Sequence, residues 1–171
     1  SISKGNVLVV YDNEITMGKN DKYVLANFDL KTGKINWQKF VSDDAIACPV
    51  IDEGEVHVAS MNGNYQVFNL KSGDVKKEIK IDAVTSPTIG EKEIFITRKS
   101  GEKEILSVYN KKTFVKEKDI QLTGALKPKD TDCFERMHHQ GSRSVQYLGH
   151  NYLISGGNLI CVNPKTEKIV W

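Results

Sequence analysis

The sequence predicts an all-β fold built from about four repeated antiparallel meanders. A turn motif returns about every 40 residues, a second marker returns in the same register, and glycine or asparagine separates short alternating strands. The chain has 171 residues, of which 39% are hydrophobic and 27% charged, as is usual for one soluble globular domain. We therefore expect a single domain over residues 1–171.

The first marker is a turn led by Asp or Asn. It occurs in four segments: 28–37, 68–75, 109–115 and 162–171. The spacing is 40 residues from Asp29 to Asn69, 41 from there to Asn110 and 53 from there to Asn163. The last interval therefore holds an insertion. The predicted repeats are 1–44, 45–82, 83–120 and 142–171, with an inserted loop at 121–141.

The second marker is a proline that leads into a strand. Cys48-Pro49-Val50-Ile51 and Ser86-Pro87-Thr88-Ile89 lie 38 residues apart. Glycine and asparagine supply the positive backbone angles that tight hairpins require. In the second repeat this predicts four strands, at 45–51, 55–61, 65–70 and 75–81.

Meanders of this length cannot bury an apolar face alone, so they must stack, and at about 40 residues per unit the usual solution is a β-propeller. Trp37 and Trp171 occupy the same repeat position, and we expect both rings to serve in packing. The same role is expected for the apolar residues that recur at matching places: Phe28, Phe68, Tyr109, Ile35, Val75, Phe114 and Ile169.

The motif Asp29-x-x-Thr32-Gly33-Lys34-x-x-Trp37 resembles the tryptophan-docking repeat of the quinoprotein-like (PQQ-type) propellers. The resemblance covers nearly the whole chain, although the motif is complete only in the first repeat. That family includes quinone-dependent alcohol dehydrogenases and enzymatically silent scaffolds, such as the propeller lipoprotein of the bacterial barrel-assembly machinery. The dehydrogenases use a vicinal cysteine pair, and this sequence has no adjacent cysteines. The non-enzymatic branch is therefore favoured.

The number of blades leaves three alternatives open. The first repeat begins at what aligns with a second strand, Asn6–Tyr11, so we expect the first blade to be incomplete. The chain is then a fragment of a larger propeller, half of a ring formed by two copies, or a small ring with modified closure. An exposed sheet edge invites pairing with another chain in each case.

Charge and cysteine content narrow the partner and the compartment. The net charge is +2, from 24 basic and 22 acidic residues that are interleaved, so no basic stripe predicts nucleic-acid binding. No apolar run is long enough to span a membrane. Three widely spaced cysteines and no visible secretory signal favour a cytoplasmic location; the alternative is periplasmic, with the signal removed.

The inserted loop and its flank carry the candidate site. Phe134, Arg136, His138, His139 and Arg143 are predicted to contact a partner, because arginine and aromatic residues are common interface anchors. The loop from Asp12 to Lys22 is a candidate neighbour.

Zinc binding by Cys133, His138 and His139 is disfavoured, because adjacent histidines on a strand point to opposite faces. A nucleophilic Cys133 is disfavoured too, since a reactive thiol also needs a shaped, positive pocket. We expect no cofactor, metal or catalytic residue.

These features predict a non-enzymatic propeller that binds a protein, such as a scaffold or an immunity protein that neutralises a toxin. A second copy of the chain is the other expected partner. The alternative is a piece of a larger quinoprotein-like propeller, either an assembly scaffold or a remnant of a quinone-dependent dehydrogenase.

Overall fold

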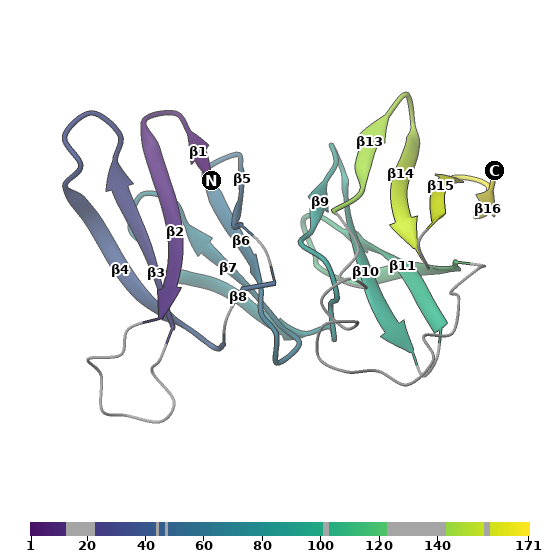
Figure 1. Cartoon of the computed structure of the whole chain (residues 1–171), viewed down its shortest axis with the longest axis horizontal. Coiled ribbons are helices and arrows are strands. Elements are labelled where there is room, and N and C mark those ends of the chain that lie inside the picture. Colours follow the sequence, from purple (N-terminus) through teal and green to yellow (C-terminus); the bar gives the residue numbers. More distant parts are fainter. Residues whose placement is uncertain (13–22, 44, 47, 101–102, 123–142, 156–157) are drawn as a thin grey trace. The chain divides into compact units, whose positions relative to one another are not determined.

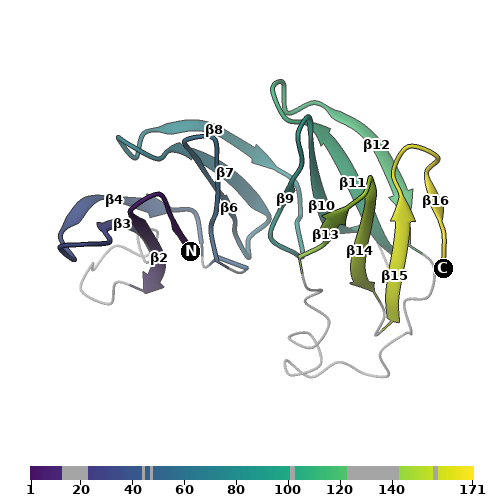
Figure 2. The same cartoon turned by 90° about the horizontal axis from the view of Figure 1, so that it is seen from above.

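The computed structural model describes residues 1–12, 23–43, 45–46, 48–100, 103–122, 143–155 and 158–171. Its contacts divide the chain into two compact units, unit 1 at Ser1–Ser86 and unit 2 at Pro87–Trp171. Each unit contains two four-stranded antiparallel sheets (Figures 1 and 2). The predicted all-β fold of four meanders is confirmed. The described residues include no helix long and apolar enough to cross a membrane.

Unit 1 holds sheets 1 and 2. In sheet 1 the strands are β1 (Ile2–Ser3), β2 (Asn6–Asp12), β3 (Tyr23–Asp29) and β4 (Ile35–Val41). In sheet 2 they are β5 (Val50–Asp52), β6 (Glu55–Ala59), β7 (Asn64–Asn69) and β8 (Val75–Lys80). In both sheets each strand pairs with the next one along the chain, as the hairpin signals predict.

Unit 2 holds sheets 3 and 4. In sheet 3 the strands are β9 (Thr88–Ile89), β10 (Glu93–Ser100), β11 (Lys103–Asn110) and β12 (Lys116–Gln121). In sheet 4 they are β13 (Val145–Tyr147), β14 (His150–Ser155), β15 (Asn158–Asn163) and β16 (Lys168–Ile169). The prediction of one domain over the whole chain stays a prediction.

Two predicted strand positions are wrong. Sheet 1 is not incomplete, because Ile2 and Ser3 pair with Val7 and Asn6 and so supply a short first strand. The first strand of sheet 2 begins at Val50 rather than at Ala45, which makes only an isolated bridge to Ser60. Proline at 49 has no N–H for a ladder, which explains the late start.

The prediction that the recurring apolar residues all pack is wrong for two of them, and the predicted repeat position of a third, Phe114, is wrong. Phe68 and Tyr109 are buried, but Ile35 and Val75 are each about half exposed, at 51% and 52%. Phe114 does not match Ile35 at all. It occupies the position of Gly33, as the strand register shows, and Lys116 takes the place of Ile35.

One turn is built four times in the same way, between the third and fourth strands of each sheet. The side-chain oxygen of Asp29 accepts hydrogen bonds from the backbone N–H of Lys31 and Thr32. Asn69, Asn110 and Asn163 accept the equivalent pair of bonds in the other three sheets. These are Asx turns, in which a short side chain replaces a backbone partner. A further bond from the Thr32 hydroxyl lowers the pKa of the Asp29 carboxyl.

The residue four positions after each Asp or Asn adopts a left-handed conformation. The φ angles are +67° at Gly33, +74° at Gly73 and +59° at both Phe114 and Glu167. Glycine takes this conformation without a steric cost, whereas Phe and Glu do not. The turn geometry is therefore kept even where the sequence has lost its glycine.

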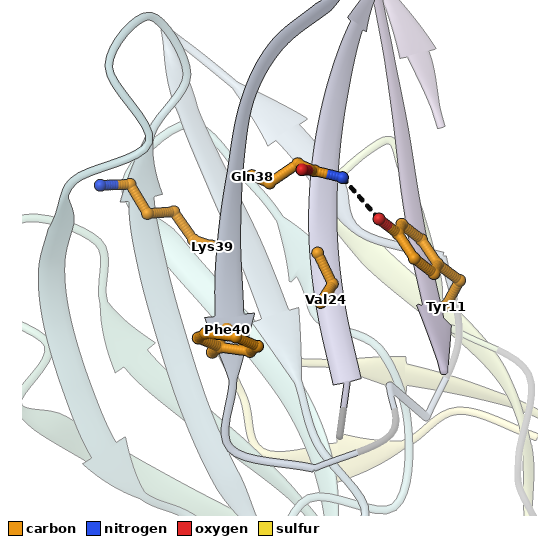
Figure 3. Close-up of a pocket in the computed structure, with 5 residues that line it drawn as sticks. All are labelled: Tyr11, Val24, Gln38, Lys39 and Phe40. Atoms are coloured by element: carbon orange, nitrogen blue, oxygen red, sulfur yellow. Dashed lines mark hydrogen bonds between the residues drawn. The ribbon is translucent and has the colours of Figure 1, made fainter. Parts of the chain in front are cut away.

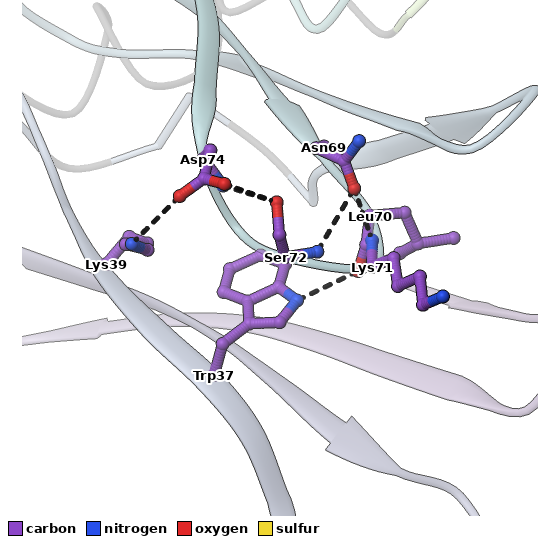
Figure 4. A network of polar contacts seen from close by, with 7 residues as sticks. All are labelled: Trp37, Lys39, Asn69, Leu70, Lys71, Ser72 and Asp74. Carbon is purple, nitrogen blue, oxygen red and sulfur yellow. Dashed lines mark hydrogen bonds and ion pairs between the residues drawn. The ribbon is translucent and has the colours of Figure 1, made fainter.

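Within unit 1, the glycine of sheet 2 receives the tryptophan of sheet 1. The indole N–H of Trp37 donates a hydrogen bond of 2.8 Å to the carbonyl of Leu70 (Figure 4). A Cβ atom at Gly73 would lie only 2.6 Å from Cδ2 of the same ring. Lys39 pairs with Asp74 beside it, at 3.5 Å. Because Trp37 is only 8% exposed, the prediction that it serves in packing is confirmed.

This joint belongs to the core between sheets 1 and 2. The buried members of that core are Leu8, Leu25, Trp37, Val41, Val56, Val58 and Phe68. In unit 2, the corresponding core between sheets 3 and 4 consists of Phe95, Leu106, Val108, Ile120, Leu122, Leu153, Ile160 and Val162. Each unit thus buries apolar surface from two sheets, which is the main source of its stability.

In unit 2, a lysine replaces the docking tryptophan. Lys118 is paired with Val108 as Trp37 is paired with Asn27, so the two side chains hold the same position. The Lys118 ammonium donates to the carbonyl of Pro164, at 3.1 Å, and this carbonyl is equivalent to that of Leu70. The hydrogen bond between sheets survives although the aromatic ring has been lost.

Sheet 3 also carries a charged network on Asp119. The Ser107 hydroxyl donates to one oxygen of this carboxylate at 2.6 Å, and Arg98 and Lys116 donate to the other at 2.7 and 2.8 Å. Partial burial would raise the pKa of Asp119, but these hydrogen bonds outweigh it and lower the pKa from 3.8 to about 2. The carboxylate is therefore ionised throughout the ordinary pH range.

Gly73→Ala is expected to destabilise the chain by about 2–4 kcal/mol. The new methyl group meets the Trp37 ring, and alanine is strained at positive φ. Gly54→Ala is the matched control, because Gly54 has a similar φ of +85° and nothing lies within 4 Å of its Cβ position. It should cost only about 1 kcal/mol. Urea unfolding measures both, and equal costs would contradict the docked joint.

Asp119→Asn is expected to cost about 1 kcal/mol at pH 7, a value discounted for solvent screening. Because the folded pKa is lowered, the contribution of Asp119 is full above about pH 4 and is lost as the pH falls through about 2. The stability of the variant should therefore approach that of the original chain in acid. Urea midpoints from pH 7 to pH 2 test this, and a constant difference would refute it.

Candidate protein-binding surface

A surface hollow in unit 2 combines exposed apolar side chains with a charged margin. It has a volume of about 490 Å³ and is formed by the β9–β10 turn, the β13–β14 turn and one residue of the β15–β16 turn. The lining residues are Glu91, Lys92, Glu93, Gln146, Tyr147, Leu148, Gly149 and Lys165. We call this feature the unit 2 hollow.

The β13–β14 turn that forms its apolar part is a two-residue hairpin. Leu148 and Gly149 both have positive φ, +46° and +75°, and Tyr147 pairs with His150 across the turn. Two successive positive φ angles define a type I′ turn, which favours asparagine or glycine because other residues are strained there. A leucine at this position has a conformational cost, and its side chain is 79% exposed.

The same hairpin occurs in sheets 1 and 2 with charged residues in the leucine position. Lys4-Gly5 has φ angles of +47° and +81°, and Glu53-Gly54 has +41° and +85°. The leucine in sheet 4 is therefore the apolar exception. Comparison of the three X-Gly pairs in the sequence could have revealed it, but the sequence-based search did not single out this residue.

Buried hydrogen bonds hold the start of β13 in place. The Thr88 hydroxyl on β9 donates to the backbone carbonyl of Ser144. The Ser144 hydroxyl in turn donates to the Thr88 hydroxyl oxygen at 2.8 Å. Both side chains are buried, at 8% and 4% exposure. A Cβ atom at Gly90 would lie 2.9 Å from the Gln146 amide oxygen, so the absence of a side chain there allows the two turns to approach. The hollow is thus supported by packed elements of sheets 3 and 4.

Of the five residues predicted to contact a partner, only Arg143 can be placed. It is exposed and immediately precedes Ser144, close in sequence to β13. Phe134, Arg136, His138 and His139 lie outside the described residues, as does most of the predicted neighbouring loop, at 13–22. Cys133 lies outside them too. Among the residues that are described, no group of three or more metal-ligating side chains occurs.

The described part of unit 1 contains one buried pair of chemically versatile side chains. His57 Nδ1 lies 2.8 Å from the Tyr65 hydroxyl, and both side chains are fully buried. Burial raises the pKa of Tyr65 well above its usual value, so the phenol stays protonated at neutral pH. The pair provides a hydrogen bond in the interior and is not accessible to a substrate.

Comparisons with solved structures identify the fold. The chain matches BamB from Moraxella catarrhalis with a TM-score of 0.64 and 14% identity, over 86% of this chain and 46% of that one. It matches quinohemoprotein alcohol dehydrogenase from Comamonas testosteroni with a TM-score of 0.65 and 12% identity, over 98% and 37%. For quinohemoprotein alcohol dehydrogenase ADHIIG from Pseudomonas putida HK5 the values are 0.62 and 12%, over 98% and 36%.

These similarities confirm the predicted fold class, a partial β-propeller. The chain spans less than half the length of each of these three structures. No protein-family model and no curated protein sequence matches it. At 12–14% identity the comparison shows the fold alone, and the neighbours include both BamB and dehydrogenases.

Proposed function

We propose that this chain is a non-enzymatic propeller that binds another protein through the unit 2 hollow. The observation that carries the proposal is the exposed Leu148 in a strained turn. Lysine and glutamate occupy the equivalent turns of sheets 1 and 2, so the fold itself does not require an apolar side chain. Strain retained together with an exposed apolar group is typical of a functional surface.

The surroundings of Leu148 fit protein recognition. Tyr147, which is 63% exposed, lies beside it, and tyrosine is enriched at the energetic centres of protein interfaces. Glu91, Lys92, Glu93 and Lys165 provide a charged margin of both signs. An apolar centre with a polar rim is the usual anatomy of a protein interface. A small ligand would instead favour a more enclosed pocket.

Within this class, two roles remain proposals. One is a cytoplasmic immunity protein that neutralises a toxin, and the other is an assembly scaffold. Cys48 and Cys161 are free thiols in the structure, which is compatible with a reducing compartment. Arg143 is exposed and precedes β13, at the end of that strand away from the Leu148 turn.

Leu148→Glu tests the binding surface. Glutamate is the residue that the equivalent turn of sheet 2 uses, at Glu53, so the free energy of unfolding should change by less than about 0.5 kcal/mol. Binding of the physiological protein partner should weaken about tenfold or more, because burial of an unpaired carboxylate at an interface is costly.

The matched control is Val115→Glu, which changes another exposed apolar residue, 61% exposed, outside the hollow. The partner is identified as a protein that the immobilised original chain and the immobilised Val115→Glu variant both retain from a lysate of the source cells. Isothermal titration with that purified protein gives the affinities. If all three chains bind it equally, the hollow is not the binding surface.

A further inference from the structure

Sheet 4 repeats the residues with which sheet 1 docks on sheet 2. In sheet 1, Leu8 pairs with Asn27, which lies opposite Trp37. In sheet 4, Tyr152 pairs with Cys161, which holds the position of Asn27. Tyr152 is therefore equivalent to Leu8. By the same register, Ile154 matches Val10 and Leu159 matches Leu25. Sheet 4 thus presents an apolar face of the kind that sheet 1 buries.

Trp171 completes this face. Its carbonyl accepts a hydrogen bond from the Cys161 N–H, at 2.9 Å, which places Trp171 opposite Cys161 as Trp37 is placed opposite Asn27. Trp171 is 59% exposed, whereas Trp37 is 8% exposed. The prediction that both tryptophans serve in packing is therefore wrong for Trp171 in the structure. Its one ring contact is a tilted one with Tyr152, with the centroids 6.2 Å apart.

The other apolar residues of this face are exposed as well. Ile154 is 45% and Leu159 58% exposed, while Leu25, the counterpart of Leu159, is fully buried. We call the face formed by Tyr152, Ile154, Leu159 and Trp171 the donor face. It has the composition of a docked sheet face, but it has no sheet packed on it among the described residues.

A matching receiving face lies on sheet 1, on the side opposite to sheet 2. Val9 and Phe40 are 41% and 48% exposed there. Gly33 is equivalent to Gly73, and the space above it is open, because nothing lies within 4 Å of its Cβ position. The carbonyl of Leu30 is equivalent to that of Leu70, which accepts the Trp37 hydrogen bond in the joint already formed.

This receiving face is also hollowed. A pocket of about 240 Å³ is lined by Tyr11, Val24, Gln38, Lys39 and Phe40 (Figure 3). The Gln38 amide donates to the Tyr11 hydroxyl at 2.5 Å, and Phe40 flanks the pocket, while Lys39 points away (Figure 3). An aliphatic side chain from an opposing sheet can occupy such a space.

We propose that the donor face of one copy of this chain docks on the receiving face of a second copy. Trp171 seats on Gly33, and its indole N–H donates to the carbonyl of Leu30. Each copy has both halves of such a joint, and the same kind of joint is formed within the chain between Trp37 and Gly73. Two such contacts, related by a twofold axis, satisfy both donor and both receiving faces.

The proposal does not depend on the protein-binding role of the unit 2 hollow, since Leu148 belongs to a turn and not to the docking residues.

Light scattering over a range of concentrations tests the proposal. The purified chain should have twice the monomer mass of 19.2 kDa. Trp171→Ala removes the seated ring, and Gly33→Ala places a methyl group where the ring must lie. Each should raise the dimer dissociation constant about tenfold or more. Val115→Ala, at an exposed residue outside both faces, should leave it unchanged.

Mixing the two variants adds a direction-specific test. A Gly33→Ala chain keeps its donor face and a Trp171→Ala chain keeps its receiving face, so the mixture should form heterodimers with one intact joint. Association in the mixture should exceed that of either variant alone.

A monomer at every concentration would overturn the proposal, as would a dimer that neither substitution weakens. Circular dichroism and urea unfolding verify that each variant is folded. If Gly33→Ala does not fold, Trp171→Ala alone tests the proposal, because the exposed Trp171 makes little contribution to the fold. If partner binding does not depend on Leu148 but dimerisation is normal, only the proposed function is refuted. If partner binding depends on Leu148 but the chain does not dimerise, only this proposal is refuted.

Discussion

The left-handed residue that closes each Asx turn is the constraint on which the rest of the structure depends. It fixes where the third strand ends and the fourth begins, and in sheets 2 and 4 it aims the backbone carbonyl of Leu70 or Pro164 toward the docking position of the neighbouring sheet. In unit 1 the small size of Gly73 then admits the ring of Trp37, which carries a hydrogen bond and a large apolar area into the joint. Sheet pairing and core packing thus follow from one turn.

The repeats have diverged around this constraint. Phe114 and Glu167 keep the positive φ without glycine, and Lys118 keeps the hydrogen bond between sheets without an indole. The conserved geometry is therefore that of the backbone and its carbonyl acceptors, and several side chains can use it. Sheet 4 has Trp171 at this position, and its ring is 59% exposed in the part of the chain that the structure describes.

The sequence predicted most of the fold because Asp or Asn and glycine act locally through side-chain bonds and backbone angles. It was less successful wherever a tertiary contact decides the outcome. The repeat position of Trp171 shows where its ring points, but not whether a sheet lies there to cover it. Ile35 and Val75 alternate correctly with their neighbours yet face solvent. The candidate site was searched for in an insertion, whereas Leu148 lies in a regular turn and is distinguished only by comparison with Lys4 and Glu53.

A double-mutant cycle on Trp37 and Gly73 tests the central claim most directly. If the cost of Gly73→Ala arises mainly from the indole ring, then in a Trp37→Ala background the same substitution should cost only the positive-φ strain, about 1 kcal/mol, as at Gly54. The two residues would then show a coupling energy of about 1–3 kcal/mol in urea unfolding. An equal cost of Gly73→Ala with and without Trp37 would contradict the view that this docked turn joins the sheets.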